Sequence, residues 1–463
     1  MVKLKKYQQI PINFMKENRG LILNHRLGSG KTITALVAMY QFKCDIIIVG
    51  PKSSKKIFED EIIKLKLDRS RFTIFTYQKL KNILMQQIEF FNNKCVIVDE
   101  AHHLRNETKD SLLISSSFYL AKKIMLLTAT PVINYPNDIA PLVNIIKKNE
   151  VMPTDKDLFN FFYFDTRKVE LKNEHLILDK MRNSISFYEK IGSKNYPKEI
   201  VYNKKIYMNK TQVEEYSKYV IKIIYDDIKP PNINIFDIKF DLLKTKKKNS
   251  FLTSTRQLSN TLNGSTDFPK IQAVFDQIEK GHFPAVVYSN YLKNGIYPFA
   301  VLFNKKNINV KMITGTTSSD KINQIVNDYN SGKIQVLLLS SAGSESLNLM
   351  NTRQLHILEP HWNESKIEQA KGRVVRYKSH NGLPLDLRFV EIYRWASIFP
   401  LPFQNQSADE YLLELSQRKL EMFNKFKKII IDSSIEKNWY VKMQRFYYKY
   451  KKYKYKYNKA KNT

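Results

Sequence analysis

The sequence predicts an α/β protein with two parallel-sheet lobes, a helical insertion between them and helices near the C-terminal end. The chain has 463 residues, which is too long for one ordinary hydrophobic core and favours two packed domains. Short apolar runs alternate with helical patterns, as in parallel sheets that helices cover on both faces. This alternation occurs twice along the chain, which predicts two domains of the same class.

The first lobe is expected over residues 1–149. Its strands are the apolar runs GLILNH, DIIIVGP, RFTIFTY, CVIVDE and KIMLLTATP, and helical stretches such as TITALVAMYQF and SKKIFEDEIIKL lie between them. Fully apolar strands that alternate with helices indicate a sheet buried on both faces. We therefore expect one α/β domain here.

The second lobe is expected over residues 268–400, where PAVVYSN, NVKMITG, IQVLLLS and RQLHILEP repeat the strand pattern. Residues 150–267 are more polar and helical, with KTKKKNS as an exposed loop, and we interpret them as an insertion or linker. Apolar residues recur every three or four positions in residues 401–436, which predicts a helical extension on the second lobe. Residues 437–463 alternate Lys and Tyr without an acidic residue and form a basic tail.

The charge balance favours a polyanionic partner. The chain has 76 Lys and Arg residues against 44 Asp and Glu residues, a formal net charge of +32, which favours nucleic acid through counterion release. The alternative is a Lys-rich composition imposed by an AT-rich genome, because Ile, Asn and Tyr are also frequent. No apolar stretch has the length of a membrane span and no signal-peptide core is present. We expect an intracellular, cytoplasmic protein without a membrane partner, and packaging in a virion is a further expectation.

The cysteine content fits a reducing compartment. Cys44 and Cys95 each begin an apolar run, where a thiol usually acts as a small buried hydrophobe. We therefore expect no disulfide framework.

The string RLGSGKT follows the first apolar strand and precedes a helical stretch, which predicts a phosphate-binding loop. Small residues let backbone N–H groups approach phosphate oxygens, and the helix N-terminus favours their negative charge. Lys31 should reach the β and γ phosphates, and the Thr32 hydroxyl should bind Mg²⁺. The strict pattern requires glycine at position 25, where this sequence has His25. The candidate nucleotide-binding residues of the loop are Gly28, Ser29, Gly30, Lys31 and Thr32.

Two adjacent carboxylates end the later apolar strand CVIVDE. Asp99 can hold Mg²⁺, and Glu100 is then free to orient or deprotonate an attacking water, because neighbouring side chains of a strand point to opposite sides. Taken alone, such a pair is a strand end that meets solvent. Together with the phosphate loop it predicts an ATP site that uses Mg²⁺.

Three further strings make a family resemblance explicit. DEAH (99–102), LLTATP (126–131) and EQAKGRVVR (368–376) resemble motifs of superfamily 2 helicases, whose core consists of two RecA-like lobes. The resemblance implies that Gln369, Arg373 and Arg376 meet ATP from the second lobe, where guanidinium groups stabilise charge on the transferred phosphoryl. The predicted catalytic residues are Lys31, Asp99, Glu100, Gln369, Arg373 and Arg376.

Other positions match family motifs outside the catalytic set. Gln8 resembles the glutamine that contacts adenine, and SSAGSESLNL (340–349) resembles motif V. One departure is Ser346, which stands where many relatives have a second glycine and puts the local turn in doubt. The residues predicted to couple the nucleotide site to movement are His102, Thr128, Thr130, Gly343 and Glu345.

Softer strings, such as FTYQKL and HWNESKIEQAKGRVVRYKSH, resemble the Swi/Snf-like branch. They are similar to viral members such as poxvirus nucleoside triphosphate phosphohydrolase I and the early transcription factor helicase subunit. The resemblance implies a nucleic-acid groove whose contacts fall mostly on phosphates. Its candidate residues are Pro51, Lys52, Thr76, Tyr77, Ser289, Thr314, Gly315 and Ser341.

The sequence therefore predicts a nucleic-acid-dependent ATP hydrolase, a DNA helicase or translocase of a large DNA virus that acts in viral transcription with RNA polymerase or other transcription proteins as partners. An ATP-dependent RNA helicase is the alternative within this class, although the long segment between the lobes favours DNA. A non-catalytic nucleic-acid-binding subunit is the alternative from another class, and only His25 and Ser346 favour it.

Overall fold

The computed structural model describes residues 4–26, 28–105, 108–132, 135–165, 170–189, 195–225, 248–341, 343, 347–362, 364–401 and 406–437. The chain divides into two compact units. Unit 1 consists of Met1–Ser193 and Lys419–Thr463, and unit 2 consists of Lys194–Arg418.

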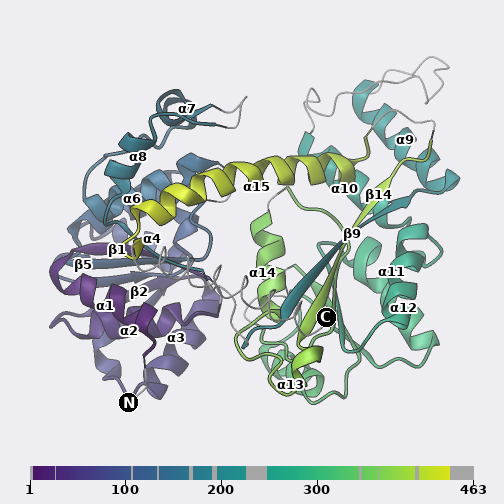
Figure 1. Ribbon diagram of the computed structural model, residues 1–463, viewed down its shortest axis with the longest axis horizontal. Helices are drawn as coiled ribbons and strands as arrows, with labels where there is room; N and C mark the ends of the chain where they lie inside the picture. Colours follow the sequence, from purple (N-terminus) through teal and green to yellow (C-terminus); the bar gives the residue numbers. More distant parts are fainter. Residues whose placement is uncertain are drawn as a thin grey trace, which may run out of the picture. The chain divides into compact units, whose positions relative to one another are not determined.

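Unit 1 is built on a sheet that has, in the described part of the chain, six strands in the order β3-β2-β4-β5-β1-β8. Figure 1 labels three of these strands, β1, β2 and β5. Every neighbouring pair is parallel. The strands are β1 (Gly20–His25), β2 (Ile46–Gly50), β3 (Phe72–Thr76), β4 (Cys95–Val98), β5 (Lys123–Thr128) and β8 (Ile185–Tyr188). The helices are α1 (Lys6–Glu17), α2 (Lys31–Tyr40), α3 (Lys52–Lys64), α4 (Tyr77–Leu84), α5 (Lys109–Ser117), α6 (Ala140–Lys147), α7 (Lys156–Tyr163) and α8 (Glu174–Met181). Short elements are η1 (Arg69–Arg71), η2 (Ala101–Arg105), η3 (Phe118–Leu120), η4 (Pro136–Ile139) and the antiparallel pair β6 (Phe164–Asp165) and β7 (Glu170–Leu171).

Strand alternation divides the core of unit 1 into two layers. In β2, Ile46 and Ile48 pack with α1, α2 and α3, whereas Ile47 and Val49 pack with α4, α5 and α6 on the other face. Successive side chains of a strand point to opposite faces, so a strand that is apolar throughout supplies both layers. All five residues of β2 are buried.

Unit 2 has, among the described residues, a second six-stranded sheet in the order β11-β12-β10-β13-β14-β9, again with parallel pairs only. The strands are β9 (Lys198–Tyr207), β10 (Ala285–Ser289), β11 (Val310–Ile313), β12 (Val336–Ser340), β13 (Gln354–Ile357) and β14 (Phe389–Ile398). The helices are α9 (Lys210–Tyr225), α10 (Lys248–Asn260), α11 (Pro269–Lys280), α12 (Tyr297–Lys305), α13 (Ser319–Asn330) and α14 (Glu364–Val374), with short elements η7 (Leu292–Ile296) and η8 (Leu385–Leu387). Helices α11 and α12 pack on one face of the sheet and α13 and α14 on the other. The predicted fold class, two parallel-sheet α/β domains, is confirmed.

The segment 150–267, expected as a helical insertion or linker, contributes a strand to each sheet. β8 pairs with β1 in unit 1, and β9 pairs with β14 in unit 2. Both strands lie at sheet edges, and most residues of β9 are exposed or half-buried. An edge strand needs no continuous apolar run, so the sequence pattern did not reveal it. The loop residues 244–247 and the basic tail from residue 438 onward lie outside the described residues.

Helix α15 (Ala408–Ser433) is the predicted helical extension, but it does not belong to one lobe. Its residues up to Arg418 belong to unit 2, and those from Lys419 belong to unit 1. Ser407 and Glu410 form a reciprocal cap at its start, since each side chain accepts a hydrogen bond from the other residue's backbone N–H. Near its end, Phe426, Ile429 and Ile430 join the core of unit 1. None of the helices in the described ranges is long and apolar enough to span a membrane.

The expectation of no disulfide was wrong. The structure joins Cys44 and Cys95 by a disulfide, with their Cα atoms 5.9 Å apart. The two cysteines are separated by 51 positions in sequence, but β2 and β4 are neighbours and Ile46 pairs with Cys95. Parallel pairing therefore brings together the amino ends of two strands whose proximity the cysteine spacing alone does not show.

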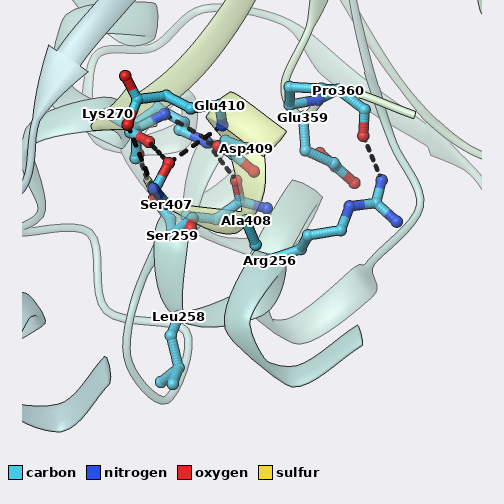
Figure 2. A network of polar contacts seen from close by, with 12 residues as sticks. Arg256, Leu258, Ser259, Lys270, Glu359, Pro360, Ser407, Ala408, Asp409 and Glu410 are labelled. Carbon is cyan, nitrogen blue, oxygen red and sulfur yellow. Dashed lines mark hydrogen bonds and ion pairs between the residues drawn. The ribbon is translucent and has the colours of Figure 1, made fainter. Parts of the chain in front are cut away.

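A buried ion pair organises the polar interior of unit 2. The ammonium of Lys270 on α11 lies 2.6 Å from Oδ2 of Asp409 on α15, and both side chains are fully buried (Figure 2). The same carboxylate oxygen accepts the backbone N–H of Ser397 at 2.9 Å, and Lys270 also donates to Asn260 at 3.0 Å. These bonds tie α10, α11 and β14 to the start of α15.

Candidate active site

The loop between β1 and α2 carries the residues predicted to bind phosphate. Gly28 and Gly30 have left-handed backbones, with φ of 74° and 85°. A side chain at position 30 would be strained by this φ, and its Cβ would lie 2.7 Å from the Gln8 amide nitrogen. Gly30 directly precedes α2, whose N-terminus supplies backbone N–H groups and a partial positive charge. Leu27 lies outside the described residues.

Lys31 is the first residue of α2. Its ammonium donates to the backbone oxygen of His25 at 2.8 Å and lies 3.5 Å from that of Arg26. The Ser29 hydroxyl is buried and has no hydrogen-bond partner among the described residues, and Thr32 is half-buried in the first turn of α2. A lysine, a buried hydroxyl and a helix N-terminus that meet at a glycine-containing loop fit a triphosphate.

Helix α1 packs against this loop. Gln8 is 5% exposed, and its amide nitrogen donates to the Gly30 backbone oxygen at 3.4 Å. The Tyr7 hydroxyl donates to the Ser29 backbone oxygen at 2.7 Å. The structure thus brings Gln8 to the loop, and its contact with adenine stays a prediction.

Asp99 and Glu100 lie at the same edge of the sheet as the phosphate loop. The carboxyl ends of parallel strands share one edge, and only β5 separates β4 from β1. Burial acts most strongly on the pKa values of both carboxyl groups and raises them, while the charge of Lys31 acts on both in the opposite direction. Two motifs that are far apart in sequence therefore meet within unit 1.

Asp99 has a hydroxyl partner that the sequence did not reveal. Burial, and next the charge of Glu100, raises the pKa of Asp99 above its usual value, although a hydrogen bond from Ser54 opposes this rise. The Ser54 hydroxyl donates to Asp99 Oδ2 at 2.5 Å, and the Tyr77 hydroxyl donates to the Asp99 backbone oxygen at 2.8 Å. A serine in the first turn of a helix is ordinary, so Ser54 gave no functional signal.

Glu100 has an unusual backbone and a strongly acidic side chain. Its φ is +48°, a left-handed value that a residue with a side chain rarely adopts and that often marks functional sites. Burial acts to raise its pKa, but the hydrogen bond and charge of His102, with the charges of Lys31 and His103, lower it to about 2. His102 Nδ1 lies 3.2 Å from Glu100 Oε2. Glu100 is therefore an ionised acceptor at neutral pH.

The residues of unit 1 that are predicted to couple the nucleotide site to movement are connected to Glu100 by polar contacts. His102 is buried, and its Nδ1 also lies 3.4 Å from the Thr128 hydroxyl at the end of β5. That hydroxyl accepts the backbone N–H of Thr130 at 3.1 Å. The structure thus joins Glu100, His102, Thr128 and Thr130 in one polar chain. Their role in coupling stays a prediction.

The nucleic-acid candidates of unit 1 lie at the starts of α3 and α4. Pro51 directly precedes α3 and Lys52, its first residue, is exposed, while the Thr76 hydroxyl accepts the N–H of Lys79 and caps α4. Burial raises the pKa of the Tyr77 hydroxyl well above its usual value, and Asp99 and Glu100 add to the rise. A cavity of about 250 Å³ opens beside Pro51 and Tyr77 and is also lined by Gln78, Lys81, His103, Leu104, Asp110, Ser111 and Ile114.

The predicted catalytic residues of unit 2 cluster at the end of α14. Gln369 and Arg373 are one turn apart on this helix, and Arg376 follows it. The Arg376 guanidinium donates to the backbone oxygen of Leu347 at 2.9 Å, and the backbone oxygen of Arg373 accepts the N–H of Leu349 at 3.1 Å. The end of α14 is therefore bound to the motif V segment.

Ser289, a candidate for the nucleic-acid groove, is fully buried at the end of β10. Its hydroxyl donates to Oε1 of Glu359 at 2.9 Å and accepts the N–H of Tyr291 at 3.0 Å. Burial raises the pKa of Glu359, and the charge of Arg256 opposes this rise. In this structure Ser289 orders the loop after β10 and presents no hydroxyl to solvent.

The other candidates of unit 2 lie in the loops that follow β11 and β12. Gly315 is exposed, and the Thr314 hydroxyl lies 2.9 Å from the Thr316 hydroxyl. The backbone N–H of Ser341 donates to the backbone oxygen of Ser289 at 3.2 Å. At Gly343, a Cβ would lie 2.6 Å from the Ile313 backbone oxygen, so the close approach of two backbones requires glycine. The coupling candidate Glu345 and the motif departure Ser346 lie outside the described residues.

Glu436, just after α15, is a buried carboxyl group that the sequence analysis did not identify. It is 2% exposed, and burial raises its pKa to about 7, although hydrogen bonds from Ser186 and from the Phe187 backbone act in the opposite direction. The Ser186 hydroxyl donates to Glu436 Oε1 at 2.5 Å, and the Phe187 N–H donates to Oε2 at 2.9 Å. A single glutamate beyond a helix carries no sequence signal of this kind.

The raised pKa makes Glu436 a source of pH-dependent stability. Between the usual pKa of 4.5 and about 7, the folded protein holds a proton that the unfolded chain releases, so this contribution is complete below pH 4.5 and lost as pH rises through 7. From pH 5 to pH 8, the free energy of unfolding of wild type should fall relative to Glu436→Gln by roughly 2.5 kcal/mol. Denaturant titrations at four pH values measure this difference. Parallel pH profiles of the two proteins would contradict it, and Glu421→Gln, an exposed change on α15, is the control.

The two parallel-sheet units and the phosphate loop facing paired carboxylates define a two-domain P-loop ATPase. Comparison with known families agrees: the SNF2-related domain matches residues 45–266, and the helicase conserved C-terminal domain matches residues 269–378. A protein of Acanthamoeba polyphaga mimivirus, named as an ATP-dependent RNA helicase, is 52% identical over 95% of this chain and 99% of its own length. The chain belongs to this SNF2-related helicase family.

More distant similarities reach other viruses and an archaeal structure. The termination factor NPH-I homolog of African swine fever virus is 22% identical over 91% of this chain and 76% of its own length. The Sulfolobus solfataricus SWI2/SNF2 ATPase core in complex with dsDNA is 17% identical, with 86% of this chain and 88% of that chain covered and a TM-score of 0.38. The protein is a helicase-family ATPase of a large DNA virus, and the predicted resemblance and enzyme class are confirmed.

Proposed function

We propose that this ATPase is stimulated by nucleic acid and converts ATP hydrolysis into movement along duplex DNA. The observation that carries the proposal is the meeting of Lys31 with Asp99 and Glu100 at one edge of the unit 1 sheet. A phosphate-binding lysine beside two carboxylates is the arrangement that phosphoryl transfer to water requires.

Each residue of this edge has a distinct role in the proposal. Lys31 and the N-terminus of α2 bind the β and γ phosphates, since both are positive and the residues directly before them, Gly28, Ser29 and Gly30, are small. Thr32 and Asp99 would hold Mg²⁺, which would neutralise negative charge on the phosphate oxygens. Glu100, ionised and held by His102, orients the attacking water.

Unit 2 supplies the remaining groups of the proposal. Gln369, Arg373 and Arg376 act on the triphosphate when nucleic acid is bound, and the arginines stabilise the charge of the transferred phosphoryl. The bond between Arg376 and the Leu347 backbone supports a link from these groups to the motif V segment.

Duplex DNA is the proposed nucleic-acid substrate, and RNA is the second candidate. The length of segment 150–267 favours DNA, whereas the name of the mimivirus relative favours RNA. The African swine fever virus relative is named as a termination factor homolog, which supports a role in viral transcription. RNA polymerase as a partner, and a location in the cytoplasm or the virion, are further parts of the proposal.

The test measures ATP turnover with no nucleic acid, duplex DNA, single-stranded DNA, duplex RNA and DNA that carries a stalled RNA polymerase. We expect the largest stimulation with duplex DNA, and a further increase with the stalled complex. Lys31→Ala and Arg373→Ala should each lower stimulated turnover by about a hundredfold or more. Glu17→Gln, an exposed change on α1, should leave it unchanged.

The outcomes separate the candidate functions. Stimulation by RNA alone replaces DNA with RNA as the nucleic-acid substrate. Turnover that is unaffected by Lys31→Ala rejects this ATP site. No turnover under any condition supports a non-catalytic binding subunit instead.

A further inference from the structure

His25 occupies the position where the strict phosphate-loop pattern has glycine, and the structure gives its side chain a defined environment. The ring is fully buried at the end of β1, beside Tyr7 and Tyr188. Burial, with the nearby charge of Lys31, lowers the pKa of His25 well below its usual value. The ring is therefore neutral and acts through hydrogen bonds.

A chain of three buried side chains connects His25 to the end of α15. His25 Nε2 lies 2.8 Å from the Ser186 hydroxyl, which in turn donates to Glu436 at 2.5 Å. The relative exposures of the three residues are 0%, 0% and 2%. Three polar groups that are buried away from water and bond to one another form a cooperative unit.

The number of protons determines the direction of this chain. Above pH 7, where the Glu436 carboxyl group is ionised and can only accept, the Ser186 hydroxyl gives its one proton to Glu436, so His25 Nε2 must carry the proton that it donates to Ser186. His25 Nδ1 is then without a proton, and it has no hydrogen-bond partner among the described residues. Ionised Glu436 thus selects the tautomer and the orientation of His25.

The backbone of His25 and its neighbours belongs to the phosphate loop. The His25 carbonyl accepts the ammonium of Lys31 at 2.8 Å, and the next N–H, of Arg26, donates to the Tyr188 carbonyl at 3.1 Å. Tyr7, which donates to the Ser29 carbonyl, stacks on Tyr188 with ring centroids 3.7 Å apart. Strand β8 therefore holds both the start and the far end of the loop.

We propose that Glu436 is a positioning residue for nucleotide binding, because through Ser186 it fixes His25 and with it the phosphate loop and Lys31. The inference rests on the proposed nucleotide site and adds to it a residue from the opposite end of the chain. Glu436 does not touch the nucleotide. Its removal lets the ring of His25 and the loop adopt other arrangements, only some of which bind phosphate.

The first test measures the affinity of a fluorescent ATP analogue for Ser186→Ala, Glu436→Ala and the double variant. Each single change should raise Kd about five- to tenfold, as expected for the loss of a buried charge-assisted hydrogen bond. The double variant should bind no more weakly than the weaker single variant, because both changes break one chain. Glu421→Ala, on the exposed side of α15, should bind as wild type does.

A purely structural role predicts a different result. Less stable variants would bind with fewer active molecules at an unchanged Kd, and this outcome would overturn the proposal, as would additive effects in the double variant. A second measurement uses the unaltered protein, so it does not depend on whether the variants fold: ¹⁵N chemical shifts at pH 8 should show His25 protonated at Nε2. Protonation at Nδ1 would also overturn the proposal.

The proposed function and this inference can fail separately. Unchanged turnover in Lys31→Ala rejects the catalytic site and leaves the binding measurement to judge Glu436. Loss of turnover in Lys31→Ala together with unchanged Kd in Ser186→Ala rejects only the role of Glu436.

Discussion

Glu100→Gln is expected to lower ATP turnover by about a hundred- to ten-thousandfold while ATP binding is retained. The amide keeps nearly the same shape but lacks the negative charge that orients water for attack. With a pKa of about 2, Glu100 is a weak base, so we expect it to act chiefly by accepting a hydrogen bond from water. Stimulated turnover and the Kd of an ATP analogue, measured on the same sample, test this expectation.

A control variant and a contradicting outcome make the Glu100 experiment interpretable. Glu17→Gln makes the same chemical change at an exposed site and should leave both quantities unchanged. If Glu100→Gln turned over ATP at the wild-type rate, another group would have to orient the water, and the assignment to Glu100 would be wrong.

Asp409→Ala is expected to destabilise unit 2 by about 3–5 kcal/mol, the range for breaking a buried ion pair. The change would leave the ammonium of Lys270 buried without its carboxylate and the N–H of Ser397 without its acceptor. Denaturant unfolding followed by tryptophan fluorescence measures the loss, because Trp362 and Trp395 both lie in this unit.

An exposed ion pair in the same unit provides the matched control. Asp328 and Lys333 are 3.2 Å apart, but their side chains are 34% and 71% exposed. Asp328→Ala should cost at most about 1 kcal/mol, since solvent screens such pairs. Equal losses in the two variants would contradict the role of burial at Asp409. The double variant Lys270→Met with Asp409→Leu should recover much of the stability, because no unpaired charge then remains buried.

The two sheets were predictable where their strands are buried on both faces. β2 and β12 are buried along their whole length, and the apolar runs that form most of each strand are visible in sequence. β8 and β9 were not recognised, because edge strands are short or half-exposed and their pairing depends on partners far away in the chain. The same dependence explains the disulfide, since Cys44 and Cys95 meet only when β2 and β4 pair.

The proximity of the residues of the candidate ATP site was predictable to a similar degree and for a similar reason. Lys31, Asp99 and Glu100 stand in local patterns whose chemistry depends on adjacent residues, and the structure brings them together. Ser54 and Glu436 have no local pattern, because their roles come from contacts across the fold.

The sequence by itself determined the class of this protein, because short-range spacing sets both the apolar strands and the loop that is predicted to bind phosphate. Only the tertiary structure decided which polar groups support that loop. Hydrogen bonds such as those of Ser186 to His25 and Glu436 join residues 161 and 250 positions apart. They form because parallel strand pairing and the packing of α15 bring these side chains to the same buried environment, where each polar group requires a hydrogen-bond partner.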